Sequence, residues 1–391
     1  MELYVGMDVS LKETSICVVD GSGEIVSEGT VISEPSTIAE FVKAKAAGAV
    51  RIGFETGPTT TWLWHELRAL GLPVICIDAR HAKAALSLQI NKSDRNDAVG
   101  LARIMQCGWY KEVQVKSVAC HEIRSVLNSR ALLVRIKRDL GNQIRGLLKN
   151  LGLVIGKAQG NVFTRRVEEL VAENPYLQQA VRPLLAVREK VSREIAGLDR
   201  KLLSLTREHQ DSRRLMTVPG VGPITALAFC AATDDPARFR RSRSVGAYFG
   251  LTPPRRHASG EVDWSGRISK CGDTMVRSYL FEAAGVLLTR VPQWCALKAW
   301  GLRLAKRIGF KKAKVAVARK LALRAAYAAP QGHGPPSAST ACGAMEPTSS
   351  GQPRRLQLRR NKVREFRESG KAVPAGTAAA VRSTEALRCF Q

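Results

Sequence analysis

The sequence predicts an α/β domain at the N-terminus, then a long helical middle, then a second, mainly helical domain. Three observations support this order. Apolar runs alternate with helical patterns over the first hundred residues, heptad-spaced leucines follow, and a glycine-rich basic region lies between helices after residue 213. The 391 residues are enough for two or three domains.

The first hundred residues predict a mixed sheet with helices. In chain order, the expected elements are strands 3–9, 14–20 and 24–31, helix 36–47 capped by Ser36, strand 50–55, helix 60–70 and strand 73–78. Three antiparallel strands followed by helix, strand, helix and strand is the order of an RNase H-like fold. That fold places carboxylates on its first strand, on a neighbouring strand and on a later helix.

Four acidic residues are the candidate catalytic groups. Asp8 and Glu55 each close an apolar run, and Asp94 and Asp97 lie three apart, on one face of a predicted helix start. Carboxylates at the ends of buried strands carry a desolvation cost unless a cation meets them, and Mg²⁺ is held by such groups. First-turn acids also stabilise a helix through its dipole, which is the simpler interpretation of the Asp94 and Asp97 pair alone. The four together favour a metal site.

The charge balance indicates a polyanionic partner. Lys and Arg number 61 against 34 Asp and Glu, giving a net charge of +27, and nucleic acid is the first candidate. The sequence contains no long uncharged span, which argues against a membrane partner. The nine cysteines form no Cys-x-x-Cys pair, which argues against zinc. Reduced thiols and the lack of a signal peptide predict a cytoplasmic, nucleoid-associated protein.

The middle region, residues 111–212, is predicted to be helical and basic. Leu133, Leu140 and Leu147 repeat every seven residues, and a second periodic stretch covers 177–209, so an antiparallel hairpin or coiled coil is expected. The cations of the first helix predict an arm that contacts nucleic acid and also dimerises, while the alternative is an ordinary solvated face. The candidate contacts are Arg130, Arg138, Arg145 and Lys149.

The C-terminal region, residues 213–325, contains two candidate phosphate-binding segments. Pro219–Pro223 before an apolar helix is similar to half of a helix-hairpin-helix, whose backbone N–H groups meet a phosphate; the alternative is a turn that only begins a helix. Residues 250–272 are expected to form a long basic loop without secondary structure, which favours a functional role. Residues 326–391 are rich in Ala, Pro, Gly and Ser and are expected to be disordered.

Taken together, these motifs resemble the IS-one-ten (IS110) family of insertion-sequence transposases, which includes the Piv-type DNA invertases. The resemblance covers about residues 3–321. Its pieces, in chain order, are Gly6-Met7-Asp8-Val9-Ser10, Phe54-Glu55-Thr56-Gly57, Lys92-Ser93-Asp94-Arg95-Asn96-Asp97-Ala98, Pro219-Gly220-Val221-Gly222-Pro223, Phe249-Gly250-Leu251-Thr252-Pro253, Ser259-Gly260 and Gly266-Arg267-Ile268-Ser269-Lys270-Cys271-Gly272.

The resemblance implies a RuvC-like domain over 1–110 with a DEDD site at Asp8, Glu55, Asp94 and Asp97, which would hold Mg²⁺ or Mn²⁺. It implies an oligomerisation region over 111–212 and a transposase domain over 213–325 with a nucleophilic serine at Ser259. The implied partners are DNA at the element ends and target, a structured guide RNA encoded beside the gene, and further copies of the chain as a dimer or tetramer.

The implied chemistry is a serine attack on a DNA phosphate. A serine hydroxyl is a weak nucleophile near neutral pH and needs a base or a metal. Ser269 is a second candidate, but the resemblance favours Ser259. His257 is two residues from Ser259 and is a candidate base, but a surface histidine is the favoured interpretation, because adjacent loop residues rarely point at the same centre. The cations near the serine would neutralise the phosphate or only contact the backbone, and they are Arg255, Arg256, Arg267 and Lys270.

Two other functions fit the sequence. A RuvC-like nuclease or junction resolvase would use the four carboxylates and a metal-activated water, without Ser259. A nucleic-acid-binding copy without activity is the other, because the chain departs from the family after Lys320-Leu321, which puts its last helix in question.

Overall fold

The computed structural model describes residues 2–87, 91, 93–239, 241–259 and 262–328. Its N-terminal domain contains a five-stranded mixed sheet in the order β3-β2-β1-β4-β5. The strands are β1 (Tyr4–Val9), β2 (Glu13–Val19), β3 (Ile25–Ile32), β4 (Arg51–Glu55) and β5 (Val74–Ile77). β1 pairs antiparallel with β2 and parallel with β4, so the predicted mixed sheet is confirmed.

Helices cover both faces of this sheet, because strand side chains alternate between faces. Val5 and Met7 of β1 pack in one cluster with α1 (Pro35–Lys45) and α2 (Thr60–Ala69). On the opposite face, Tyr4 packs in a cluster with α3 (Ala79–Leu86) and α4 (Asp94–Cys107). One detail of the prediction is wrong: Ser36 does not cap α1, because the helix begins at Pro35 and Glu34 takes the cap position.

The backbone of α4 lies directly on the central strand at Gly6. A Cβ atom on Gly6 would lie 2.1 Å from the backbone nitrogen of Ala102 and 2.4 Å from the carbonyl oxygen of Ala98. Gly53 of β4 is crowded instead by the flexible side chain of Met105. Only glycine permits this close approach of helix to strand.

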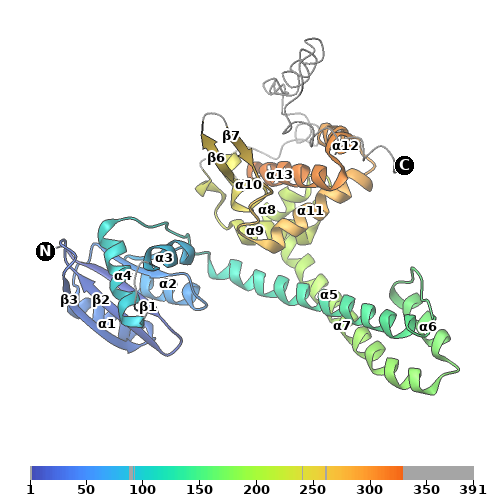
Figure 1. The fold of residues 1–391 in the computed structure, drawn as a ribbon, viewed down its shortest axis with the longest axis horizontal. Helices are drawn as coiled ribbons and strands as arrows, with labels where there is room; N and C mark the ends of the chain where they lie inside the picture. The colour runs from blue at the N-terminus through green and yellow to red at the C-terminus, as the bar shows by residue number, and fades with distance from the viewer. Residues whose placement is uncertain (1, 88–90, 92, 240, 260–261, 329–391) are drawn as a thin grey trace, which may run out of the picture. The chain divides into compact units, whose positions relative to one another are not determined.

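The middle of the chain is an antiparallel helix pair (Figure 1). It consists of α5 (Val118–Lys149) and α7 (Pro175–Glu208), joined through the shorter α6 (Gly160–Val171). Arg130 of α5 pairs with Asp199 of α7, and the distal core includes Ile144, Leu148, Val181 and Leu185. The heptad leucines Leu133, Leu140 and Leu147 are only half-buried.

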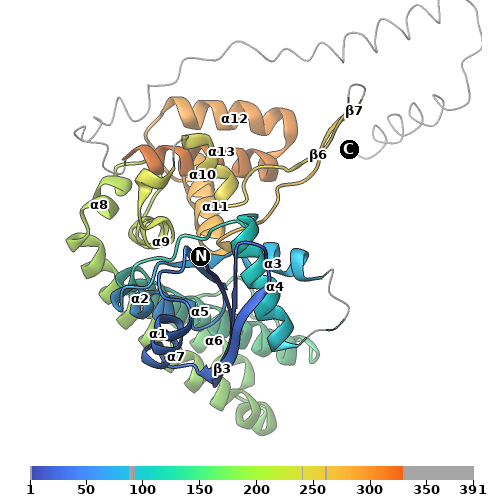
Figure 2. The same cartoon turned by 90° about the vertical axis from the view of Figure 1, so that its left-hand side faces the viewer.

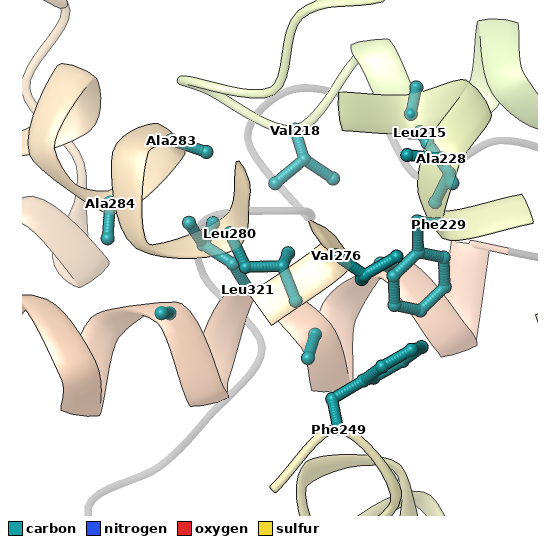
Figure 3. Packing of buried hydrophobic residues seen from close by; sticks show 14 of the residues in the cluster. Leu215, Val218, Ala228, Phe229, Phe249, Val276, Leu280, Ala283, Ala284 and Leu321 are labelled. Carbon is teal, nitrogen blue, oxygen red and sulfur yellow. The ribbon is translucent and has the colours of Figure 1, made fainter. Parts of the chain in front are cut away.

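The C-terminal domain is mainly helical. Its elements are α8 (Gln210–Met216), α9 (Pro223–Thr233), the 3-10 turn η1 (Pro236–Arg238), α10 (Ser242–Tyr248), β6 (Arg255–Ser259), β7 (Val262–Ser265), α11 (Thr274–Thr289), α12 (Ala296–Ile308) and α13 (Phe310–Ala328). Phe229 and Phe249 meet at 5.2 Å between ring centroids beside Val276 (Figure 3). Leu127 of α5 and Leu202 of α7 belong to the same buried cluster, so the helix pair is rooted in this core.

The last described helix completes this core. Leu321, Ala322 and Ala325 of α13 are almost fully buried, and Figure 3 shows Leu321 beside Leu280. The helix is therefore present up to Ala328 despite the change in composition. The predicted disorder over 326–391 falls almost entirely outside the described residues. Among the helices that the structure describes, none is both long and apolar enough to cross a membrane.

Asp234 fixes the start of α5. Its carboxylate accepts hydrogen bonds from the backbone N–H and the hydroxyl of Ser117, at 2.8 and 2.9 Å, and from the thiol of Cys120 at 3.1 Å. Asp234 has a φ of 59°, a rare conformation for a residue with a side chain. Burial alone would raise the pKa of Asp234, but the hydrogen bonds from Cys120 and Ser117 and the charge of Lys116 hold it below its ordinary value.

We expect Asp234 to make stability fall at acid pH. A carboxyl whose pKa is lower in the folded state stabilises the fold above its unfolded pKa, about 3.9 for Asp, and loses that contribution as the pH falls through the folded value. Melting temperatures measured from pH 7 to pH 3 should therefore fall less steeply below pH 4 in Asp234→Asn than in wild type. Asp139→Asn, on an exposed part of α5, should keep the wild-type profile. Parallel profiles of melting temperature against pH for wild type and Asp234→Asn would contradict the lowered pKa of Asp234.

The contact at Gly6 predicts a severe packing defect. Gly6→Ala should lower the free energy of unfolding by about 2–3 kcal/mol, because the new methyl group meets the backbone of α4, which cannot move aside locally. Gly21→Ala is the matched control, since a Cβ there meets nothing within 4 Å. Urea unfolding followed by tryptophan fluorescence measures both variants. Equal stability of the two would show that α4 does not press on β1.

Candidate active site

Asp8 and Glu55 end two neighbouring parallel strands. The ladder between β1 and β4 pairs Met7 with Phe54, and the next residue on each strand is the carboxylate. Both acidic residues are half-buried. Because β1 and β4 run in the same direction, the two residues lie at the same edge of the sheet.

The first turn of α4 lies at this same edge, because α4 runs antiparallel to β1. Its middle, at Ala98 and Ala102, lies over Gly6. Its last turn lies over the opposite end of the sheet, where Arg51 of β4 donates a 2.8 Å hydrogen bond to the carbonyl of Met105. The N-terminal turn, with Asp94 and Asp97, is therefore directed toward the ends of β1 and β4.

Three local contacts fix the start of α4. The Ser93 hydroxyl accepts from the backbone N–H of Asn96 at 3.2 Å and caps the helix. The Asn96 side chain donates to the carbonyl of Asn91. Arg95 forms a two-point ion pair with Glu28 of β3, at 2.6 and 2.9 Å. This first turn contains two acidic residues: Asp94, which is exposed, and Asp97, which is half-buried.

The backbone positions of the four acidic residues lie toward one edge of the sheet, but their side chains do not form a closed cluster. Within the described ranges, no three side chains of the His, Cys, Asp or Glu type are grouped closely enough to hold a metal ion. The donor set nevertheless suits Mg²⁺ or Mn²⁺, because both take carboxylate oxygens together with phosphate oxygens from a substrate. The positive end of the α4 dipole also favours anionic groups here.

Ser259 lies in a β-hairpin and not in a loop. β6 and β7 pair antiparallel, and Ser259 is opposite Val262 at the end of the ladder. The expectation of a long loop without secondary structure over 250–272 is therefore wrong. Figure 2 shows the hairpin projecting from the helices of this domain. The side chains of the hairpin, including Arg255, Arg256, His257 and Ser259, lie outside the described part of the structure.

The base of this hairpin is a tight contact between two backbone segments. Ser269 N–H donates to the carbonyl of Thr252 at 2.9 Å, and Lys270 N–H donates to that of Gly250 at 3.2 Å. A Cβ on Gly250 would lie 2.3 Å from the carbonyl oxygen of Cys271, and one on Gly272 would lie 2.0 Å from that of Tyr248. These contacts explain why glycines occur in both motifs.

Arg277 of α11 holds the two segments together. Its guanidinium donates to the carbonyls of Phe249, at 3.2 Å, and of Cys271, at 2.8 Å. Asp273 caps the same helix through the N–H of Val276 and accepts from Arg124 of α5 at 2.5 Å. A chain of contacts therefore runs from α5 through the start of α11 to the hairpin base. Arg124, Asp273 and Arg277 were not identified from the sequence. No local sequence pattern indicates a contact between residues that are 149 positions apart.

The Pro219–Pro223 turn joins α8 to α9. Gly220 has a φ of +88°, and a Cβ there would meet the carbonyl oxygen of Ala283 in α11 at 2.8 Å. Pro223 occupies the first position of α9, which has Gly222 as its cap. The turn thus has a packing role, and phosphate binding by its N–H groups stays a prediction.

The predicted basic contacts differ in what they touch. Arg130 pairs with Asp199, and Arg145 donates to the carbonyls of Gly156 and Ala158. These two side chains therefore hold the fold of the helix pair. The others are exposed: Arg138, which pairs with the neighbouring Asp139, Lys149, Arg267 and Lys270. Lys270 has a φ of 56°, an uncommon conformation at the base of the hairpin.

Comparison with known proteins covers both candidate regions, the acidic residues and the hairpin. A family model described as "Transposase IS116/IS110/IS902 family" matches residues 212–299. A second model, a transposase model of the DEDD type from IS110 elements, matches residues 5–152. The match over 212–299 contains the hairpin, and the match over 5–152 contains the four acidic residues.

Several curated proteins are similar to the chain. The transposase for insertion sequence element IS1111A of Coxiella burnetii is 28% identical over 321 residues, 81% of this chain and 86% of that protein. A putative transposase, y4pF/y4sB, of Sinorhizobium fredii is 33% identical over 59% of this chain and 60% of its own length. A probable family 20 transposase of Pseudomonas aeruginosa is 31% identical over 56% and 65%. The chain thus spans less than two thirds of the latter two.

We expect Arg277→Lys to loosen the hairpin. Nη1 of Arg277 donates to the Phe249 and Cys271 carbonyls while Nη2 donates to the Thr274 hydroxyl. A lysine lacks the rigid planar guanidinium and cannot make all three bonds together. Hydrogen exchange of the β6 and β7 amides, read by mass spectrometry, should become about tenfold faster, the equivalent of roughly one lost hydrogen bond. Arg290→Lys, at the other end of α11, is the control and should leave the exchange unchanged. An unchanged hairpin in Arg277→Lys would show that the backbone contacts alone hold it.

Proposed function

Because the chain belongs to the IS110 family of insertion-sequence transposases, we propose that it cuts and rejoins DNA through a metal-assisted DEDD site and a phosphoserine at Ser259. The observation that supports the metal site most strongly is the direction of α4. Its first turn, with Asp94 and Asp97, is directed toward the strand ends that carry Asp8 and Glu55. Three elements from separate parts of the sequence bring carboxylates to one edge.

The four carboxylates would hold one or two divalent cations. When bound, Mg²⁺ or Mn²⁺ offsets the negative charge that develops on the phosphate and helps to align it for attack. Asp8 and Glu55 are placed on adjacent strands, and rigid strands position ligands better than loops do. The capped and ion-paired start of α4 holds Asp94 and Asp97 in the same way.

Ser259 would be the nucleophile. Its oxygen forms a bond to phosphorus, its proton passes to a base or to solvent, and the displaced deoxyribose oxygen leaves and is protonated to a hydroxyl. The phosphodiester energy is kept in the phosphoserine, so that attack by a DNA hydroxyl reverses the exchange without ATP. The location of Ser259 at the end of a clamped hairpin supports this role, because the hairpin base is fixed by Gly250, Gly272 and Arg277.

The proposed partners are duplex DNA, a structured guide RNA and further copies of the chain. The net charge of +27 supports binding of polyanions. The antiparallel helix pair supports contacts between copies, because it is rooted in the C-terminal core and carries exposed apolar side chains such as Leu132 and Val187. In this account target choice depends mainly on the RNA.

The test is a search for a covalent protein–DNA adduct. Purified full chain is mixed with transcript from the non-coding end of the element, labelled junction DNA and Mg²⁺, and run on a denaturing gel. A protein-linked band is expected in wild type and should be absent in Ser259→Ala and in Asp8→Ala. Ser269→Ala is the matched control and should keep the band, since its side chain only accepts a long bond from Cys271 N–H.

Two outcomes would contradict the proposal. Free cleaved DNA that persists in Ser259→Ala would show a metal-dependent hydrolase, the RuvC-like nuclease that uses the same carboxylates. Loss of the protein-linked band in Ser269→Ala, with retention of the band in Ser259→Ala, would identify Ser269 as the nucleophile.

A further inference from the structure

The last two described helices have an unusual charge pattern. Residues 291–328 contain ten Lys and Arg residues and no Asp or Glu. Some of these cations hold the domain together. Lys314 lies 3.8 Å from the centroid of the Phe281 ring, and Lys320 lies 4.2 Å from that of Trp300. Such cations cover aromatic surface and need no external partner.

Five other cations gather where α12 turns into α13; these helices lie side by side in both views (Figures 1 and 2). We define the α12–α13 corner as the exposed residues Arg303, Lys306, Arg307, Phe310, Lys311 and Lys312. None of its five cations has an ion-pair partner among the described residues. Phe310 is 43% exposed between them, and the preceding Gly309 makes the turn with a φ of +86°.

The helix dipole opposes the cations of this corner that lie at the start of α13. Lys306 and Arg307 lie in the last turn of α12, where the helix dipole favours cations. Lys311 and Lys312 lie in the first turn of α13, which has no acidic residue, and there the dipole opposes them. Like charges also repel across the turn. A polyanion bound at this corner removes both penalties at once.

We propose that the α12–α13 corner binds an unpaired RNA strand. Its cations contact successive phosphates, and the exposed Phe310 ring stacks on a base. Duplex DNA satisfies the cations but keeps its bases stacked inside the helix, so it leaves Phe310 without a partner. Unpaired bases are available in the loops of a folded RNA. The inference rests on the proposed function only in its choice of RNA as the source of single strands.

The test uses the full chain and a 20-nucleotide oligouridylate, with a 20-base-pair DNA duplex as the second probe. Affinities are measured by fluorescence anisotropy at several salt concentrations. Lys311→Gln/Lys312→Gln should reduce the slope of log affinity against log salt by about 1.4 on oligouridylate, at about 0.7 per phosphate contact on a single strand. Lys43→Gln/Lys45→Gln, in the last turn of α1, removes the same charge and should leave the slope unchanged.

The aromatic contact is tested separately. Phe310→Ala should weaken oligouridylate binding by about tenfold with an unchanged salt slope, because stacking is sequence-tolerant and uncharged. Phe310→Trp should retain wild-type affinity, which distinguishes stacking from loss of fold, and melting curves check each variant.

Three results would overturn the inference. The corner variants could match the α1 control on oligouridylate, Phe310→Ala and Phe310→Trp could weaken binding equally, or only duplex binding could change, which would identify duplex DNA as the occupant. Oligouridylate binding needs no cleavage, so it is scored whether or not the phosphoserine adduct forms.

Discussion

The N-terminal domain depends on one close contact, in which the backbone of α4 lies on Gly6 of the central strand. A side chain at this position would hold the helix away from the sheet. Because the contact fixes both the distance and the direction of α4, it determines where the first turn of the helix lies. The first turn, with Asp94 and Asp97, is then directed toward the strand ends, at an edge where the dipole of α4 is positive. Packing and chemistry are linked through a residue that has no side chain.

The C-terminal domain also depends on close backbone contacts that only glycine permits. Gly250 and Gly272 let two backbone segments meet, and Arg277 ties their carbonyls to α11. The hairpin is thus held at its base by the folded core, while its strands β6 and β7 project from the domain (Figure 2). Asp273 and Arg124 connect the same helix start to α5. The hairpin and the helix pair therefore share one support.

Much of the fold follows from local pattern, and the rest depends on long-range contacts. Apolar runs ending in Asp8 and Glu55 gave the strands and two candidate ligands, because a buried carboxylate at a strand end is costly without a partner. The β6–β7 hairpin was missed because its strands are rich in Arg, His and Ser, which hides the alternation of a strand. Arg277 was missed because its role is to bind carbonyls, which no side-chain motif records. Heptad spacing overstated the burial of Leu133, Leu140 and Leu147, which are only half-buried.

In the proposed function, Asp8, Glu55, Asp94 and Asp97 hold divalent cations at one edge of the sheet. The most direct measurement is a Mn²⁺ titration of the full chain by electron paramagnetic resonance, comparing wild type with Asp8→Asn and with the surface variant Asp139→Asn. Wild type and Asp139→Asn should bind Mn²⁺ alike, and Asp8→Asn should lose at least one bound ion. Equal binding by all three proteins would contradict it.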